Sequence, residues 1–345
     1  MWNRTLLTSW VLLLLAGCSS AQNKTSDQQT NHMSQSVYLL EYSAIQRFYK
    51  AALNLQTSFT DFCTEKANKQ QVRASWQEAF DQWMFLQGQE RGPIGALEQN
   101  WNIQFWPDKK NTTGRKMVGL LARDQPITVS EIRQQSVAVQ GLGAMEWLLY
   151  DLSSPLSQSE TDNFTACQLG SVIAQNLVNN SEIIYQAWTE NPWRNLEQTV
   201  WLSEYISLLS NQLAFAESKL VRPMANIGVP RPYFAEAWRS RSSLRSLEKN
   251  IEALQQLYHA DQNGLDNLLR QRGFIDLAER VDTQFTGLLQ NWPQQPDLFD
   301  FLQTKEGYRE ALGLKNKIEQ LNYLINQEVA VSLGVVIGFN STDGD

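Results

Sequence analysis

Proline and glycine divide this chain into long segments whose apolar residues recur at helical spacing. Within the segments, apolar residues follow one another at intervals of three and four, as in helices that bury one face. Alternating strand patterns are scarce, and the Asp343-Gly344 turn pair lies at the extreme end of the chain. We therefore expect an all-α fold. The expected helices span residues 36–62, 68–88, 130–151, 162–189, 195–220, 231–258, 263–291 and 305–333.

These helices are expected to form two packed bundles, residues 36–192 and residues 193–345, which together make one body. The division falls near Pro192, with the same number of expected helices on either side. A short echo between Glu78-Ala79-Phe80 and Glu236-Ala237-Trp238 favours an internal duplication of the two halves.

The first residues have the form of an export signal. Residues 1–17 contain the basic Arg4, then the apolar run Leu12–Leu15, then small residues. The apolar run is too short to span a bilayer, and LAGC at its end resembles a bacterial lipoprotein box. That resemblance implies cleavage before Cys18 and lipid on its thiol, which would anchor the chain stably. Residues 18–35 are then the lipidated cysteine and a flexible polar tether.

The sequence also indicates where the protein acts and which partners it lacks. By analogy with sorting in such lipoproteins, Ser19 rather than an aspartate after Cys18 favours the outer membrane, on its periplasmic face or at the cell surface. The formal net charge is −7 at pH 7, which gives no basic face of the kind that binds nucleic acid.

Two cysteines remain in the folded part of the chain. In an oxidising compartment, an even pair is more often a disulfide than a metal site or a nucleophile. We expect Cys63 and Cys167 to form a disulfide bond that closes a loop of roughly 100 residues and stabilises the fold by on the order of 4 kcal/mol.

The stretch Val137–Asp151 places a carboxylate among apolar residues. Glu146 falls on the same helical stripe as a set of apolar residues, and Gly143 sits about one turn before it, where glycine costs roughly 1 kcal/mol relative to alanine. The apolar members of the stripe are Ile132, Val139, Leu142 and Leu149. One interpretation is structural, with Glu146 satisfied by an arginine or by backbone donors. The other is a small polar cavity that holds a ligand or a metal.

The connection over residues 89–129 is too long for an ordinary loop in a compact domain. Its large apolar residues, which precede Pro107-Asp108, argue against disorder. They are Trp101, Ile103, Phe105 and Trp106. The segment is expected either to cover the bundle and wall a pocket near Glu146, or to be additional core.

The expected helix over residues 231–258 repeats the inward carboxylate. Its apolar stripe, extended backwards, reaches Ser240 and Glu236, and Arg239 lies close enough to pair with Glu146 or Glu236. A basic ridge follows on the same helix and is expected to be a solvated face. The ridge consists of Arg241, Arg245 and Lys249.

Several of these motifs together resemble the imelysin family of bacterial periplasmic and surface proteins, in its lipoprotein branch. The resemblance rests on Trp76 with the Trp83 segment, Phe105-Trp106-Pro107-Asp108, GLGAMEWLLY, Glu236-Ala237-Trp238-Arg239-Ser240 with Ser243-Leu244, and Gly338-Phe339-Asn340 before Asp343-Gly344-Asp345. It implies an all-α body of two related bundles with a site between them. Founding members are described as metallopeptidases and others as iron-regulated proteins, with a GxHxxE motif as the presumed metal site.

This chain departs from that motif at its histidine. Gly141 matches the first glycine and Glu146 the glutamate, but Gly143 stands at the histidine position. The only histidines are His32 and His259, and no HExxH sequence occurs. Because a hydrolytic zinc site needs about three nitrogen, oxygen or sulfur ligands, a carboxylate-rich site suits calcium, magnesium, manganese or ferric iron better.

The residues themselves indicate only a polar pocket. The resemblance implies a non-catalytic binding lipoprotein that acts in the uptake of a metal ion, such as iron or calcium, or of an iron complex, with a membrane transport protein as its expected partner. The expected ligand-binding residues are Gly141, Gly143, Glu146, Glu236, Arg239, Ser240 and Asp108, with Glu146 as the metal ligand. Two alternatives stay open: a metallopeptidase with a histidine-poor site, and a structural adaptor for a membrane partner.

Overall fold

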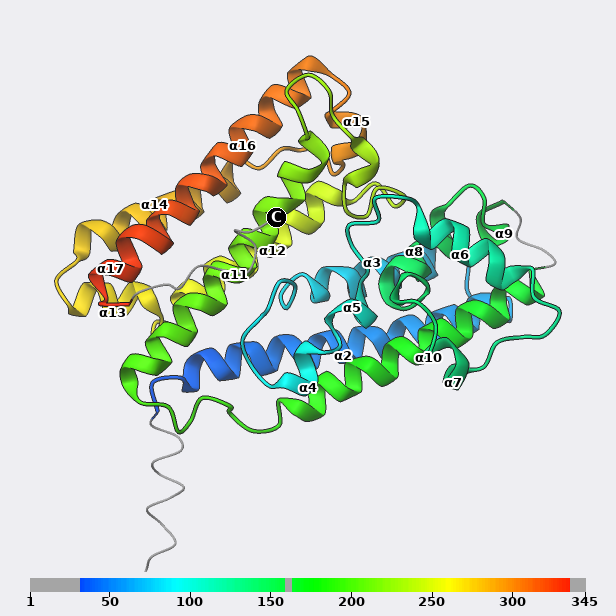
Figure 1. Cartoon of the computed structure of the whole chain (residues 1–345), viewed down its shortest axis with the longest axis horizontal. Coiled ribbons are helices and arrows are strands. Elements are labelled where there is room, and N and C mark those ends of the chain that lie inside the picture. Colours follow the sequence, from blue (N-terminus) through cyan, green and yellow to red (C-terminus); the bar gives the residue numbers. More distant parts are fainter. Residues whose placement is uncertain (1–31, 159–162, 336–345) are drawn as a thin grey trace, which may run out of the picture. The chain divides into compact units, whose positions relative to one another are not determined.

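The computed structural model describes residues 32–158 and 163–335. Within these residues the regular structure is helical, and the sole β feature is an isolated bridge between Asn226 and Val229. The prediction of an all-α fold is confirmed. Met33 and the described residues after it form one compact unit (Figure 1).

Three long helices organise the part of the chain before residue 192. They are α2 (Gln35–Cys63), α3 (Lys69–Trp83) and α10 (Phe164–Ala187). Helix α2 packs against both others, and α2 and α10 run side by side (Figure 1). The crossing is close at Gly170, where an added Cβ would lie 2.1 Å from the ring of Phe59. Only glycine leaves room for the buried Phe59 ring at that contact.

The rest of the described chain forms a second group of helices. Helix α11 packs against both α12 and α16, and α14 packs against the same two helices. Figure 1 shows the group in green to red. The members are α11 (Gln198–Met224), α12 (Ser243–His259), α13 (Leu265–Gln271), α14 (Ile275–Gln290) and α16 (Lys305–Tyr323).

Shorter helices complete the fold. They are α4 (Ile94–Leu97), α5 (Asn100–Ile103), α6 (Thr112–Leu121), α7 (Val129–Ile132), α8 (Gly141–Tyr150), α9 (Pro155–Gln158), α15 (Leu298–Phe301) and α17 (Ala330–Ser332), the 3₁₀ turns η1 (Val137–Val139) and η2 (Pro232–Phe234), and the π-helix η3 (Leu324–Val329).

Three of the expected helices differ from the structure because turns interrupt them. The segment 130–151 is divided into α7, η1 and α8. The segment 263–291 breaks between α13 and α14, where the backbone N–H of Phe274 donates to the carbonyl of Leu269 at 2.9 Å. The segment 231–258 contains the short 3₁₀ turn η2 and becomes α-helical only at Ser243.

The long connection also contains more regular structure than its sequence predicts. Helices α4, α5 and α6 lie within residues 89–129. Two of them are one-turn helices, too short to leave a visible apolar period.

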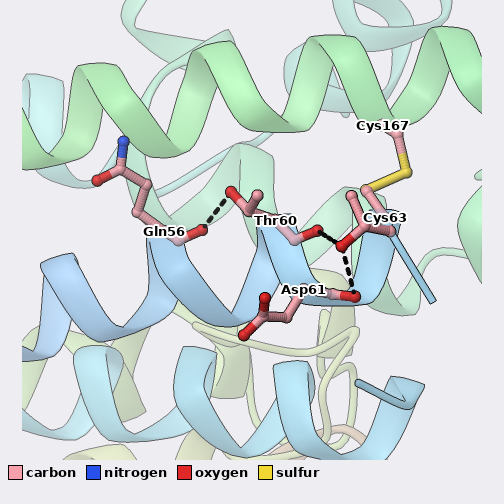
Figure 2. The surroundings of a disulfide bond; sticks show 6 residues. Gln56, Thr60, Asp61, Cys63 and Cys167 are labelled. Carbon is pink, nitrogen blue, oxygen red and sulfur yellow. Dashed lines mark hydrogen bonds between the residues drawn. A yellow bond between two sulfur atoms is a disulfide. The ribbon is translucent and has the colours of Figure 1, made fainter. Parts of the chain in front are cut away.

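The disulfide bond between Cys63 and Cys167 is confirmed (Figure 2). Cys63 is the last residue of α2 and Cys167 lies in the first turn of α10, with Cα atoms 5.7 Å apart and a sequence separation of 104. Nearby, the hydroxyl of Thr60 donates to the carbonyl of Gln56 at 3.0 Å (Figure 2). The bond therefore joins the ends of the two helices that pack side by side.

Other sequence predictions lie outside the described residues. These are the signal at residues 1–17, the lipid site at Cys18 and the ending motifs at residues 338–345. The internal duplication and the division into residues 36–192 and 193–345 stay predictions. Among the helices of the described ranges, none combines the length and apolarity that a membrane span requires.

Candidate functional site

Helix α8 is buried on nearly every side. All of its residues except Gly143 and Tyr150 are buried, so the helix is apolar all round rather than amphipathic as its stripe suggests. Helix α3 holds it in place, because the indole N–H of Trp76 donates to the carbonyl of Leu142 at 3.0 Å. Its first residue, Gly141, has a φ of +63°, and an added Cβ there would lie 2.1 Å from the carbonyl oxygen of Ile103. Gly141 therefore fixes the start of α8 and does not line a cavity.

Glu146 points into the protein from this helix. Its side chain belongs to a residue that is 5% exposed, and its Oε1 accepts hydrogen bonds from the backbone N–H and the hydroxyl of Ser240, at 2.8 and 2.9 Å. Within the described residues, its Oε2 accepts no hydrogen bond. Burial raises the pKa of Glu146, while the charge of Arg239 and the two bonds from Ser240 oppose the rise. The structural interpretation of Glu146 has support because Oε1 is hydrogen-bonded by the fold. The interpretation as a ligand site also has support, because Oε2 is free to accept a bond from a ligand.

The donors to Glu146 come from a turn and not from a helix. Residues 235–242 precede α12 and contain two residues with positive φ, Ala237 at +47° and Arg241 at +59°. The hydroxyl oxygen of Ser240 also lies 3.0 Å from the carbonyl oxygen of Ala237, so its single proton is shared between that carbonyl and Glu146. The turn aims the backbone N–H of Ser240 at Glu146, which a residue inside a helix could not do because its N–H is used in the helix.

Arg239 pairs with neither of the carboxylates expected from sequence. Its Nε donates to Oδ2 of Asp151 at 2.7 Å, and its Nη2 donates to Oδ1 of Asn111 at 2.7 Å. The guanidinium also lies 4.4 Å from the centre of the Trp238 ring. Arg239 therefore joins the turn to the end of α8, and it affects Glu146 through its charge alone.

A small cavity of about 30 Å³ lies beside Glu146. A buried water molecule needs roughly 10 to 15 Å³ measured in this way, so the space admits about two. An added Cβ on Gly143 would meet only the carbonyl oxygen of Phe105, at 3.8 Å, and Gly143 therefore leaves this space open. The lining residues are Phe80, Gln104, Phe105, Trp106, Asp108, Thr113, Gly143, Glu146, Tyr233, Ala235, Ala237, Trp238 and Arg239.

The long connection has both of the roles predicted for it. Phe105 and Trp106 wall the cavity, while Ile103 is fully buried in the core. Asp108 lines the cavity as well, but its two oxygens accept from the backbone N–H groups of Thr112 and Thr113 at 2.6 and 2.9 Å. Asp108 is therefore committed to the amino end of α6.

Glu236 belongs to a neighbouring buried network. It forms an ion pair with Lys219, both side chains being 1% exposed, and it accepts from Gln87, Gln104 and Ser246. Burial lowers the pKa of Lys219, and the carboxylate of Glu236 opposes that effect. The network links the segment after α3 to α11 and α12. Sequence analysis missed Lys219, whose signal is its spacing of three residues from the buried Ala216 on α11.

The basic ridge is exposed in part, and each member is paired. Arg241 contacts Asp297 and Asp300, Arg245 contacts Asp81, and Lys249 contacts Glu252. The ridge therefore carries no unpaired charge toward a ligand.

The donor set does not fit a metal ion held by protein ligands alone. Over residues 32–158 and 163–335, no group of three or more histidine, cysteine, aspartate or glutamate side chains lies close enough to share an ion. His259 contacts Asp282 at 3.1 Å and takes no part in the site. The acceptors beside the cavity include Oε2 of Glu146 and the carbonyl oxygen of Phe105, neither of which accepts a hydrogen bond from the described residues. Its chemistry suits the positive or hydrogen-donating end of a ligand that brings most of its own partners.

Comparison with known proteins identifies the class to which this fold belongs. The imelysin family model (peptidase M75) matches residues 41–329. The chain therefore belongs to the imelysin family. No curated protein matches it.

Two solved structures resemble the fold. The first is an imelysin-like protein from Psychrobacter arcticum 273-4, with a TM-score of 0.75 and 17% identity over 91% of this chain and 98% of the other. The second is described as a "putative iron-regulated protein A precursor" from Parabacteroides distasonis ATCC 8503, with a TM-score of 0.59 and 12% identity over 91% of this chain and 95% of the other.

Proposed function

We propose that this protein is a non-catalytic binding protein that acts in metal or iron acquisition and takes its ligand at Glu146. The observation that carries the proposal is the available Oε2 of a buried glutamate, next to the space that Gly143 leaves open. The description of one similar structure as an iron-regulated protein A precursor supports iron as the metal.

The ligand is a metal complex that keeps most of its own donors. One carboxylate oxygen and one carbonyl oxygen are too few to replace the ligand shell of an iron or calcium ion, which takes about six or more oxygen ligands. A cavity of about 30 Å³ admits an ion or a single group and excludes a whole chelate. The remainder of the ligand would lie outward, toward Tyr233, which lines the cavity and is 61% exposed.

The site of action is the cell envelope. The proposal places the protein at the outer membrane through lipid on Cys18 after the LAGC sequence, with a transport protein of the membrane as its partner. The disulfide between Cys63 and Cys167 supports an oxidising compartment.

The first experiment is a calorimetric titration with ferric citrate. Glu146→Gln keeps an oxygen that can accept from Ser240 and replaces Oε2 with a donor, so we expect it to weaken binding by at least about tenfold, or roughly 1.4 kcal/mol. Glu252→Gln is the matched control, because it removes the same charge from a side chain that pairs with Lys249 outside the cavity. Equal affinity of Glu146→Gln and the unchanged protein would exclude this cavity as the site.

A second variant tests the role of the missing histidine. Gly143→His has room for its Cβ, since the nearest atom is 3.8 Å away, and it restores the family motif. We expect the imidazole to fill the cavity, to weaken ferric citrate binding, and to raise the affinity for bare Zn²⁺ by at least about tenfold because it adds a second protein ligand. Peptide cleavage that Glu146→Gln abolishes would instead contradict a purely binding role.

A further inference from the structure

A second, larger cavity lies between the segment that follows α3 and helix α11. Its volume is about 150 Å³. Two of its lining residues, Gln104 and Trp106, also wall the Glu146 cavity, and the others are its own. The lining residues are Trp83, Gln87, Gly88, Gln89, Glu90, Asn100, Trp101, Gln104, Trp106 and Phe215.

Aromatic rings form much of this wall. Trp106 and Phe215 pack with ring centres 5.6 Å apart, and Trp83 is buried. Trp101 is 55% exposed, although it packs beside Phe105 with ring centres 6.1 Å apart. The face of an indole ring carries partial negative charge and attracts cations. A large, exposed indole at the edge of a cavity is therefore available to a cationic ligand.

Within the described part of the chain, two amide oxygens of the wall are unused acceptors, and the buried indole N–H of Trp83 is an unused donor. The amide nitrogen of Gln89 donates to Glu41, and that of Asn100 donates to the backbone carbonyl of Gln89 at 3.0 Å. Among the residues that the structure describes, no hydrogen bond reaches Oε1 of Gln89 or Oδ1 of Asn100. Gln89 is 6% exposed, so its oxygen faces little solvent and gains from a donor. Glu90 is exposed and, within the same residues, forms no ion pair.

We propose that this cavity binds a small organic cation that carries a primary ammonium or guanidinium group. Glu90 supplies the opposite charge, Gln89 and Asn100 accept the N–H groups, and the indole rings cover the apolar part. The volume equals that of roughly ten buried water molecules, which suits a chain of about five carbons with one amine.

The test compares two molecules of equal length, n-pentylamine and pentan-1-ol, by calorimetric titration of the full protein at pH 7 and low ionic strength. We expect the unchanged protein to bind the amine at least tenfold more tightly than the alcohol. Glu90→Gln should remove most of that preference, whereas Glu310→Gln, which changes an exposed glutamate in α16, should keep it.

Two further variants distinguish binding of the amine in the cavity from non-specific binding to the protein surface. Trp101→Ala should weaken amine binding about tenfold, and Trp101→Phe should restore part of it. Because Trp101 is largely exposed, both should keep the circular dichroism of the folded protein. Glu146→Gln should leave amine binding unchanged, so this result does not depend on ferric citrate binding. Equal affinity for amine and alcohol, a preference that survives Glu90→Gln, or binding of glucose in place of the amine would overturn the proposal.

Discussion

Glu41 is a second carboxylate that the fold removes from water. It lies on α2, is 3% exposed, and accepts a hydrogen bond from the amide of Gln89. Burial raises the pKa of Glu41 to about 8, although the bond from Gln89 and the charge of Arg47 oppose the rise. Ionising Glu41 is therefore unfavourable in the folded state, and the stability of the protein should depend on its protonation.

The sign of that dependence follows from the two pKa values. Since the pKa of Glu41 is about 8 in the folded state and 4.5 in the reference state, the folded state binds more protons between these values. The contribution of Glu41 to the free energy of unfolding is full below about pH 4.5 and is lost as the pH rises through about 8. Glu41→Gln cannot ionise and should be more stable than the unchanged protein at pH 8.5, by roughly 3 to 5 kcal/mol.

Urea unfolding at pH 4.5 and at pH 8.5 measures this difference. The advantage of Glu41→Gln should nearly vanish at the lower pH, where the native carboxyl is protonated too. Glu310→Gln, an exposed change in α16, should show no such pH-dependent gain. The same stability difference at both values of pH would show that Glu41 does not titrate in this range.

For single residues, the sequence predicted which side chains are buried better than it predicted their hydrogen-bond and ion-pair partners. The apolar stripe around Glu146 indicates an inward side chain, and the structure buries it. Its partner could not be predicted, because Ser240 donates from a turn with positive φ at Ala237 and Arg241, neither of which is a glycine. The role of Lys219 could not be predicted for a related reason. Its ion pair with Glu236 depends on the tertiary packing of two segments that are separate in sequence.

At the scale of one element, the two glycines of α8 should respond oppositely to the same substitution. Gly141→Ala combines a φ of +63° with a Cβ 2.1 Å from the carbonyl oxygen of Ile103, so we expect a loss of about 3 kcal/mol or more in the free energy of unfolding. Gly143→Ala adds a Cβ that meets only the carbonyl oxygen of Phe105, at an ordinary contact distance of 3.8 Å, in the first turn of α8. We expect it to raise the free energy of unfolding by up to about 1 kcal/mol, because alanine is favoured over glycine in a helix.

Urea unfolding of the two alanine variants checks this contrast, each serving as the control for the other. A destabilised Gly143→Ala would mean that the space beside Glu146 is smaller than described. An unaffected Gly141→Ala would mean that α8 can begin in another conformation.

Element boundaries were harder to predict than elements. Long helices such as α2 and α10 have many turns over which an apolar period shows, and the sequence placed them within a few residues. The segment over residues 130–151 was expected to be one helix, yet the turn after Ile132 and the positive φ of Gly141 interrupt it. Apolar spacing continues across the break because α7, η1 and α8 pack on the same core.

At the scale of the whole molecule, buried polar contacts join segments that are far apart in sequence. Glu236 receives Lys219 from α11, Ser246 from α12, and Gln87 and Gln104 from the segments around α4 and α5. Such a network cannot be deduced from helical periodicity, which describes each helix alone. The all-α class and the disulfide could be predicted because they depend on composition, spacing and compartment.

The disulfide provides the test of stability for the molecule as a whole. Cys63 and Cys167 are 104 residues apart, so their bond removes a large part of the conformational freedom of the unfolded chain. The double variant Cys63→Ser/Cys167→Ser should lose about 4 kcal/mol of unfolding free energy in urea, with a steeper denaturant dependence because its unfolded state is more expanded. A reducing agent should lower the stability of the unchanged protein to the same level and leave the double variant unaffected. Neither cysteine lines the Glu146 cavity, so ferric citrate affinity should be preserved wherever the variant is folded. A stability loss under 1 kcal/mol would mean that the packing of α2 against α10 persists in the unfolded chain.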